Sequence, residues 1–271
     1  MKKQFKLGVI GCGFMAQSIM RGVVLSDFLN EKKIIVSDVS EDNLDKVNYL
    51  GVRTALDNRL VAENSEYVLF AVKPQNFADA VKSLGGFVPE KVISVMAGVK
   101  KNTIKNSFGL GAAVKVARCM PNLPCSIGSG AIGIDMLDFN NSTDDTDFIS
   151  NVFNCLGTIL SIDESKMDAV TGISGSGPAY VFMFIDSLID AGVNQGLSKN
   201  QAKILAVQTV LGAAEMVERD EESVSELIMR VCSKGGTTIE AVKVLEDNKF
   251  RSIISNAVDA CVQRAKELSD K

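Results

Sequence analysis

The chain has 271 residues, of which 46% are hydrophobic and 23% are charged, and its formal net charge is −4. This balance is typical of a globular protein with one large or two modest domains, and it argues against a nucleic-acid-binding protein. The sequence contains no histidine, which excludes Ser-His-Asp hydrolases and His-ligated zinc enzymes. We therefore expect chemistry without an imidazole proton shuttle and no metal site.

The six cysteines form no C-x-x-C pair, which indicates free thiols in a reducing compartment. The basic start of the chain is not followed by a small-residue cleavage site. The longest uncharged run of interest, residues 169–185, is interrupted by glycines and Pro178. It is also shorter than the roughly 20 apolar residues of a membrane-spanning helix. The sequence predicts a cytoplasmic protein that binds no membrane.

Short β-rich runs alternate with helical patterns over residues 1–163. Such alternation predicts an α/β fold, a Rossmann-like doubly wound parallel sheet with helices on both faces. The predicted strands cover 5–10, 34–37, 67–72, 92–95 and 114–117, and the predicted helices cover 15–25, 41–49, 77–84 and 102–107.

The pattern changes from about residue 164 onward. No proline follows Pro178, and long stretches with apolar residues at helical spacing cover 178–195, 199–219 and 250–268. We therefore predict two domains, a dinucleotide-binding domain at 1–163 and an all-α domain at 164–271. An apolar stripe in the first long helix could pack inside its own domain or against another subunit; its residues are Tyr180, Val181, Phe182, Phe184, Ile185, Leu188 and Ile189.

A glycine-rich turn follows the first predicted strand. The segment Gly11-Cys12-Gly13-Phe14-Met15-Ala16 is G-x-G-x-x-A and precedes a predicted helix. In dinucleotide-binding folds the first glycine permits a tight turn, the second lets the backbone approach the pyrophosphate, and the third small residue lets helix and strand pack closely. The alternative to dinucleotide binding is a glycine-rich turn between strand and helix that binds no ligand.

Asp38 supports the binding interpretation, because it ends the second predicted strand, 22 residues beyond Ala16. A carboxylate in this place can bind ribose hydroxyls, and it would repel a 2′-phosphate, so taken alone it favours NADH. Asp is also common in solvated turns, which leaves a second interpretation of Asp38 open. Arg59, beside Asn58, could neutralise a phosphate only if folding brings it close.

Four further segments of the chain carry a combined sequence signal. They are Phe70-Ala71-Val72-Lys73-Pro74-Gln75, Arg118-Cys119-Met120-Pro121-Asn122-Leu123-Pro124, the run from Thr171-Gly172 through Ser174-Gly175-Ser176-Gly177-Pro178 to Tyr180, and Val231-Cys232-Ser233-Lys234-Gly235-Gly236-Thr237-Thr238-Ile239. In their order and separation these segments resemble the pyrroline-5-carboxylate reductase family. Lys234 and Ser223 stand where that family usually has proline, Leu123 stands where threonine is usual, and Met229-Arg230 replaces a more polar pair.

The resemblance implies NADPH or NADH as cofactor, with NADPH usual in the family, a small imino acid as substrate, and a homodimer or larger homo-oligomer. It also implies hydride transfer to the C=N bond of 1-pyrroline-5-carboxylate, which gives L-proline in the last step of proline biosynthesis. A protonated imine is already electrophilic, so this reaction needs no strong general acid, in keeping with a chain without histidine.

By the same resemblance, Thr238 and Ser233 are the expected catalytic residues. Glu221 could instead belong to a solvated acidic run, Ser233 or Thr237 could simply cap a helix, and Lys73 could be an ordinary surface lysine. The expected substrate-binding residues are Ser176, Gly177, Val231, Gly235, Gly236, Thr237 and Glu221. The expected cofactor-binding residues are Gly11, Cys12, Gly13, Phe14, Met15, Ala16, Ser37, Asp38, Asn58, Ala71, Val72, Lys73, Pro74, Met120, Pro121 and Asn122.

Two other functions stay open on the sequence. The chain could reduce a related cyclic imine or another small carboxylate, and substrate profiling separates these. It could also be a non-catalytic dinucleotide-binding sensor that keeps the fold, which Lys234 in the substrate loop leaves possible. Binding of the cofactor without turnover would identify the sensor.

Overall fold

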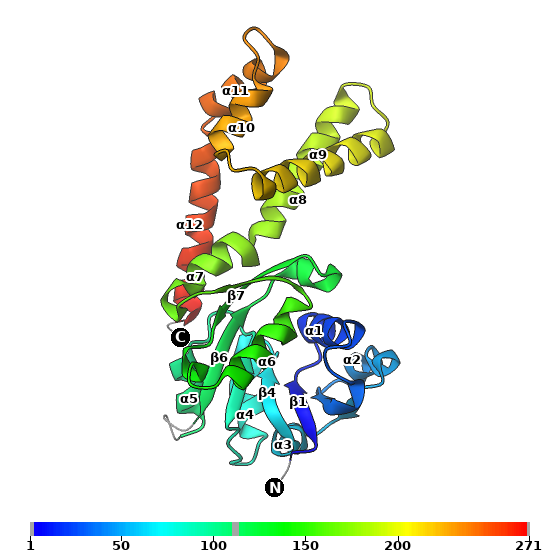
Figure 1. Cartoon of the computed structure of the whole chain (residues 1–271), viewed down its shortest axis with the longest axis vertical. Coiled ribbons are helices and arrows are strands. Elements are labelled where there is room, and N and C mark those ends of the chain that lie inside the picture. The colour runs from blue at the N-terminus through cyan, green and yellow to red at the C-terminus, as the bar shows by residue number, and fades with distance from the viewer. Residues whose placement is uncertain (1–2, 110–113, 270–271) are drawn as a thin grey trace. The chain divides into compact units, whose positions relative to one another are not determined.

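A computed structural model of the protein describes residues 3–109 and 114–269 (Figure 1). These residues divide into two compact units. The first contains the described residues up to Ser176 together with those from Cys261 onward, and the second is Gly177–Ala260.

The first unit is built on a sheet that, within the described residues, has eight strands in the order β3-β2-β1-β4-β5-β6-β7-β8 (Figure 1). Neighbouring strands are parallel from β3 to β6, β7 is antiparallel to β6, and β8 is parallel to β7. The strands are β1 (Phe5–Ile10), β2 (Ile34–Ser37), β3 (Arg53–Ala55), β4 (Ser65–Phe70), β5 (Lys91–Ser94), β6 (Lys115–Met120), β7 (Gly130–Asp135) and β8 (Gly157–Ser161).

Helices cover both faces of this sheet, because its central strands are apolar on both sides. In β4, Leu69 belongs to one hydrophobic cluster and Phe70 to the other. One cluster includes buried residues of α1 (Phe14–Leu25), α2 (Glu41–Asp45) and α6 (Thr143–Asn154). The other includes residues of α3 (Asn58–Asn64), α4 (Phe77–Lys82) and α5 (Lys101–Ser107). The predicted Rossmann-like doubly wound fold is confirmed.

The chain is helical from residue 164 onward, as predicted. A short 3-10 turn at Glu164–Lys166 leads into α7 (Met167–Val170) and a π-helical turn at Thr171–Gly175. The second unit contains α8 (Gly177–Asn194), α9 (Lys199–Arg219), α10 (Val224–Val231), α11 (Thr237–Asp247) and the first half of α12 (Phe250–Ser269). Within it α8 and α9 lie side by side (Figure 1).

Several elements differ from the sequence prediction. The helix predicted at 41–49 ends at Asp45 and is followed by a 3-10 turn at Asn48–Leu50. The buried residues Leu44, Val47 and Leu50 are spaced three apart, which matches a 3-10 turn better than an α-helix. The sequence pattern did not predict β3, α3, β7, α6, β8 or α10.

The domain boundary predicted between residues 163 and 164 stays a prediction. In the division into two compact units, residues 164–176 belong to the unit that contains the sheet.

Candidate functional site

The turn after β1 requires glycine at its first position. Gly11 has a φ of 95°, and its N–H donates to the carbonyl oxygen of Ser37 at 2.8 Å. A Cβ added to Gly11 would lie 2.9 Å from the backbone of Ala71, so no side chain fits there. A Cβ added to Gly13 would meet nothing within 4 Å. Gly13 therefore leaves open space directly before the first turn of α1, where backbone N–H groups can bind an anion.

Asp38 lies just beyond β2, is half-buried and is held in place by the turn. Its carboxylate accepts hydrogen bonds from the Cys12 N–H at 2.6 Å, the Ser40 N–H at 2.9 Å and the Asn43 side-chain amide at 3.3 Å. These contacts hold the carboxylate beside the glycine turn, where a ribose would bind.

Cys12 is unsuited to act as a nucleophile. Its side chain is buried, and its thiol donates to the carbonyl oxygen of Asn43 at 3.3 Å. Burial, and after it the nearby carboxylate of Asp38, raises the pKa of the Cys12 thiol to about 11. The thiol is therefore protonated at neutral pH and serves the packing of the turn.

A cavity of about 540 Å³ opens beside this turn, at the carboxyl edge of β1, β2 and β4. Among the residues expected to bind the cofactor, Gly11, Gly13, Asp38, Asn58, Ala71, Val72 and Lys73 line it. The sequence did not predict its other lining residues, which are Ile10, Val39, Ser40, Asn43, Asn76, Asp79, Ala80 and Ser83.

The polar side chains of the missed set carry a weak sequence signal. Ser40 and Asn43 follow Asp38 closely, and they reach the cavity because α2 begins at Glu41, immediately after the strand. Ser83 accepts a hydrogen bond from the Asn58 amide at 2.9 Å, and Asn58 in turn accepts from the Ser37 hydroxyl at 2.6 Å. This chain of hydrogen bonds orients Asn58. Arg59 pairs with Glu63 at 2.6 Å and does not line the cavity.

The remaining expected cofactor residues lie outside the lining of this cavity. Ala16 is buried in the first hydrophobic cluster, with Met15 packed against it, whereas Phe14 is exposed. Pro74 begins the short 3-10 turn after β4. Met120 ends β6, and Pro121 and Asn122 follow it at the same carboxyl edge of the sheet.

The segment around Ser176 is locally unusual. The π-helical turn at Thr171–Gly175 ends where the Ser176 N–H donates to the Thr171 carbonyl oxygen at 2.8 Å. The Ser176 Oγ and the Cys261 Sγ are 3.0 Å apart, which joins the turn to the last half of α12 within the first unit. Single π turns inside helices are frequent at functional sites.

In the helical unit, the start of α11 has the form of a small anion site. Gly236 is the N-cap and no side chain caps the helix, so the N–H groups of Thr237 and Thr238 have no side-chain partner at the cap. Gly235 has a φ of 74°, which favours glycine. A Cβ on Gly236 would collide with the Ser233 hydroxyl. Ser233 thus lies directly against Gly236, the residue before Thr237 and Thr238. Gly236 is the N-cap residue of α11, so neither Ser233 nor Thr237 caps the helix in this structure.

The other two expected substrate residues are exposed. Val231 ends α10 with its side chain largely exposed. Glu221 lines an open cavity of about 800 Å³ with Gly212, Glu215, Met216, Arg219, Asp220 and Glu222. Arg230 pairs with both Asp220 and Glu222, at 2.9 Å and 3.1 Å, which leaves Glu221 outside that ion pair.

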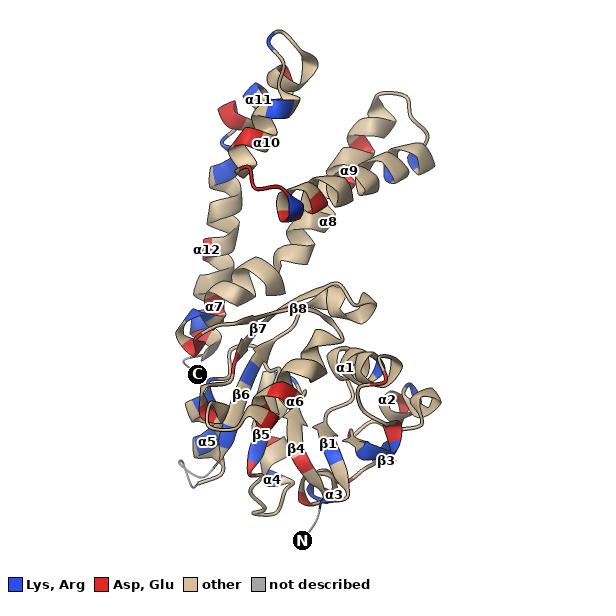
Figure 2. Ribbon diagram, in the orientation of Figure 1, with Lys and Arg blue, Asp and Glu red and all other residues tan. Residues whose placement is uncertain are grey.

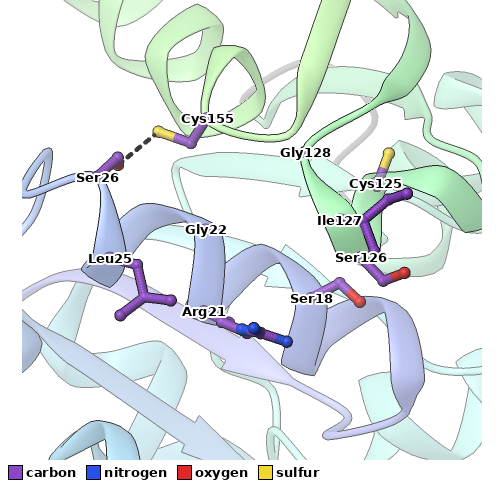
Figure 3. Close-up of a pocket in the computed structure, with 10 residues that line it drawn as sticks. All are labelled: Ser18, Arg21, Gly22, Leu25, Ser26, Cys125, Ser126, Ile127, Gly128 and Cys155. Atoms are coloured by element: carbon purple, nitrogen blue, oxygen red, sulfur yellow. Dashed lines mark hydrogen bonds between the residues drawn. The ribbon is translucent and has the colours of Figure 1, made fainter.

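A third cavity, of about 350 Å³, lies between α1 and the 3-10 turn at Leu123–Ile127 (Figure 3). Arg21 and Leu25 on α1 line it, together with Ile127 and Cys155, and the Ser26 hydroxyl donates to the Cys155 sulfur at 2.9 Å. The sequence indicated no function for these residues.

In residues 3–109 and 114–269, no group of three or more Cys, Asp or Glu side chains could hold a metal ion. No helix in the same ranges has the length and apolar character needed to cross a membrane.

Comparison with known proteins adds to this geometry. Residues 164–268 match the family described as pyrroline-5-carboxylate reductase dimerisation, and residues 6–98 match the one described as NADP oxidoreductase, coenzyme F420-dependent. The chain is 40% identical to the pyrroline-5-carboxylate reductase of Arabidopsis thaliana, over 98% of this chain and 96% of the relative.

Solved structures give the same result. The Coxiella burnetii pyrroline-5-carboxylate reductase is 36% identical with a TM-score of 0.86, and the match covers 98% of this chain and 99% of that one. The Plasmodium falciparum pyrroline carboxylate reductase, solved with NADP bound, is 30% identical with a TM-score of 0.88, covering 99% of this chain and 100% of that one.

Proposed function

Because the chain belongs to the pyrroline-5-carboxylate reductase family, we propose that it reduces the C=N bond of 1-pyrroline-5-carboxylate with NADPH or NADH and releases L-proline. The observation that carries this proposal is the cavity at the glycine turn, where Gly13 leaves the helix start open and Asp38 is fixed beside it. The residues present therefore fit a dinucleotide.

The first unit holds the cofactor in this proposal. The pyrophosphate lies at the N-terminus of α1, against the open space at Gly13, and the adenosine ribose lies at Asp38. Asn58 and Lys73 line the same cavity and contribute a polar and a positively charged side chain. The reduced nicotinamide, when bound, supplies the hydride.

The second unit holds the substrate carboxylate. The N–H groups of Thr237 and Thr238 at the start of α11 and the Ser233 hydroxyl bind the anion. The Thr238 hydroxyl hydrogen-bonds the ring nitrogen of the protonated imine, whose carbon receives the hydride while the nitrogen keeps its proton. Because the iminium supplies its own positive charge, this chain needs no side chain with a shifted pKa as general acid.

The assay that tests the proposal follows oxidation of NADPH and NADH with 1-pyrroline-5-carboxylate as substrate, and with a six-membered cyclic imine as competitor. We expect turnover with the five-membered substrate to exceed that with the six-membered one. Replacing Thr238 by Ala should lower kcat/KM by about 100-fold, as is usual when a hydrogen bond to the reacting group is lost. Cofactor binding without any turnover by the wild-type protein would refute the proposal.

Asp38 makes NADH the better cofactor of this chain, in our proposal. Its carboxylate lies at the ribose position of this proposal, Arg59 pairs with Glu63, and the described residues that line the cavity include no arginine to compensate a 2′-phosphate. We expect Asp38→Asn to shift the ratio of kcat/KM values about 10-fold towards NADPH, through removal of about 1.4 kcal/mol of repulsion. Steady-state rates with both cofactors measure this ratio, and an unchanged ratio would contradict the role given to Asp38.

We also propose that the chain forms a homodimer or a larger homo-oligomer through its helical unit. Apolar side chains are exposed on α8 and α9, including Phe182, Met183, Leu205 and Leu211. Figure 2 shows few charged residues along α8, and large exposed apolar areas mark association surfaces. A second copy of this chain is the occupant that the dimerisation match at residues 164–268 supports. A cytoplasmic location stays a prediction.

A further inference from the structure

The side-chain amide of Asn122 joins two segments that are far apart in the sequence. Its nitrogen donates to the carbonyl oxygen of Ser174 at 3.0 Å, and its oxygen accepts from the N–H of Ala131 at 3.1 Å. The residue is 7% exposed. Since one neighbour is an acceptor and the other a donor, the orientation of the amide is fixed by chemistry. Both polar groups of the amide are thus engaged within the protein.

The path of the chain brings these segments together at the carboxyl edge of the sheet. β7 and β8 run away from this edge, antiparallel to β6, and α7 with the π-helical turn then returns towards it. A Cβ on Gly133 would lie 2.8 Å from the side chain of Val170, so the missing side chain lets α7 lie directly against β7. The returning segment therefore ends beside Met120 and Asn122.

Close packing reinforces the hydrogen bond. A Cβ on Gly175 would lie 2.9 Å from the terminal methyl of Met120, so glycine lets the turn rest on the end of β6. The five-residue hydrogen bond from Ser176 to Thr171 widens the helix there. A widened turn is less favourable than α-helix and persists only where its surroundings fix it. Asn122 provides that constraint by holding the Ser174 carbonyl.

We propose that Asn122 is a positioning residue for hydride transfer, acting through the Ser174–Ser176 turn and not as a cofactor ligand. This inference rests on the proposed function. With the ribose at Asp38 beyond β2 and the pyrophosphate at the turn after β1, the far end of an extended dinucleotide follows the carboxyl edge towards β6. Asn122 therefore fixes the turn that carries Ser176 at the part of the carboxyl edge where, in the proposed function, the far end of the dinucleotide lies.

The variant Asn122→Asp tests this role with nearly the same side-chain shape. It keeps an acceptor for the Ala131 N–H but places an oxygen against the Ser174 carbonyl oxygen, which repels the turn. We expect kcat to fall by about 10- to 100-fold, because small misplacements of reacting groups have effects of this size. The dissociation constant of NAD(P)H, measured by fluorescence, should stay within about two-fold of wild type.

Two readouts separate positioning from a merely structural role. The deuterium isotope effect on kcat with C4-deuterated cofactor should rise, because misplacement slows the hydride step itself. In the cofactor-free protein, hydrogen–deuterium exchange should increase in peptides covering 167–176 and stay unchanged in those covering β1 and β4. The matched control is Ser65→Ala at the opposite edge, which loses the buried hydrogen bond to the Val61 carbonyl at 2.7 Å and should leave kcat and the isotope effect unchanged.

Three other results would overturn the inference. A lower melting temperature with unchanged kcat and isotope effect would show a purely structural role. A higher dissociation constant of NAD(P)H for the variant, with unchanged kcat, would show that Asn122 is a cofactor ligand. If Asn122→Asp does not fold, Gly175→Ala displaces the same turn by pressing on Met120 and should give the same kinetic signature; a wild-type rate there would overturn the inference. Lack of turnover by the wild type contradicts the proposed function instead, and the exchange experiment on cofactor-free protein still decides the contact.

Discussion

The two units of this protein bury their apolar residues to different extents. The sheet-containing unit has two hydrophobic clusters, one on each face of the sheet, with side chains such as Tyr67, Phe70 and Phe153 fully buried. In Gly177–Ala260, all of whose residues the structure describes, the buried residues are Ala202, Ala206 and Leu227. The first unit is thus complete as a folded body, whereas the second needs another surface to cover it.

This difference matches the division of labour in the proposed enzyme. The cavity proposed to hold the dinucleotide is formed by strand ends and short loops within a well-buried core, so its geometry does not depend on a second copy. The helical unit has several apolar side chains that are exposed to water in a single copy of the chain. Assembly with a second copy would bury these side chains. Cofactor binding should therefore survive loss of assembly, and catalysis should not.

The largest effect is expected from charged residues on the exposed apolar face of α9. Ile204 and Leu211 lie seven residues apart on one side of the helix and are 60% and 54% exposed. The double change Ile204→Glu/Leu211→Glu should give monomers by analytical ultracentrifugation and lower kcat by at least about 100-fold, since buried unpaired charges prevent association. The dissociation constant of NAD(P)H should not change.

The control for this double variant lies in the first unit. Tyr49 is 70% exposed on a 3-10 turn remote from the helical unit in sequence, and Tyr49→Glu should leave both assembly and turnover unchanged. If the α9 variant keeps the oligomeric state of the wild type, the exposed face of α9 is not the association surface. The helical unit would then not need a second copy to cover this face.

A smaller effect is expected from a charge cluster at the amino edge of the sheet. Asp145 is buried, accepts a hydrogen bond from the Tyr67 hydroxyl and pairs with Lys91 at 2.5 Å. Burial alone would raise the pKa of Asp145, but hydrogen bonds from Lys91, Tyr67 and Ser142 together lower it. Asp145→Asn should lower the free energy of unfolding by about 2 kcal/mol at pH 7, below the value for a fully buried pair because Lys91 is partly exposed.

The pH dependence of this effect has a definite sign. A carboxyl group whose pKa is lowered by folding stabilises the protein above its unfolded-state pKa of about 4, and it loses that contribution as the pH falls through the folded-state pKa. The difference between wild type and Asp145→Asn in urea unfolding should therefore shrink in acid. Glu240→Gln, in an exposed pair with Lys243, is the control and should change stability by less than about 0.5 kcal/mol.

The smallest expected effect concerns Ser223, which stands where the family usually has proline. Ser223 forms a capping box with Glu226, in which the Ser223 N–H donates to the Glu226 carboxylate at 2.7 Å and the Glu226 N–H donates to the Ser223 hydroxyl at 3.3 Å. Ser223→Ala should cost about 1 kcal/mol of α10 stability. Circular dichroism during thermal unfolding measures the loss, and Ser187→Ala, in the middle of α8, should have a smaller effect.

The sequence predicted the central parallel strands and the long helices closely, because burial on both faces and helical periodicity are strong local signals. Both β1 and α9 begin and end at the predicted residues. β7 and β8 were missed, since Gly130, Gly133 and Gly157 interrupt their apolar pattern. Those glycines are required by close contacts with Cys125, Val170 and the neighbouring strand, which only the folded structure contains.

The site was predictable to the extent that a motif fixes backbone geometry. Gly11, Gly13 and Asp38, which the motif predicts to bind the cofactor, line one cavity, because the turn and the strand end define their positions. Ser40 and Asn43 had only the weak sequence signal of following Asp38 closely, and Ser83 had none, since all three reach the cavity through the placement of α2 and α4. The partners of Asn122 were equally hidden, because Ser174 lies 52 residues away and the contact depends on the return of α7 to the sheet.

The last residues of α12 belong to the sheet-containing unit, although 84 residues of the other unit precede them. Leu268 lies against Gly98, and Cys261 lies against Ser176. During synthesis, the nascent sheet unit therefore remains without its closing segment until the residues from Cys261 onward have left the ribosome. A chain that stops before Cys261 would expose the loop after β5 and become a substrate for chaperones and proteases, even though every strand of its sheet has been made.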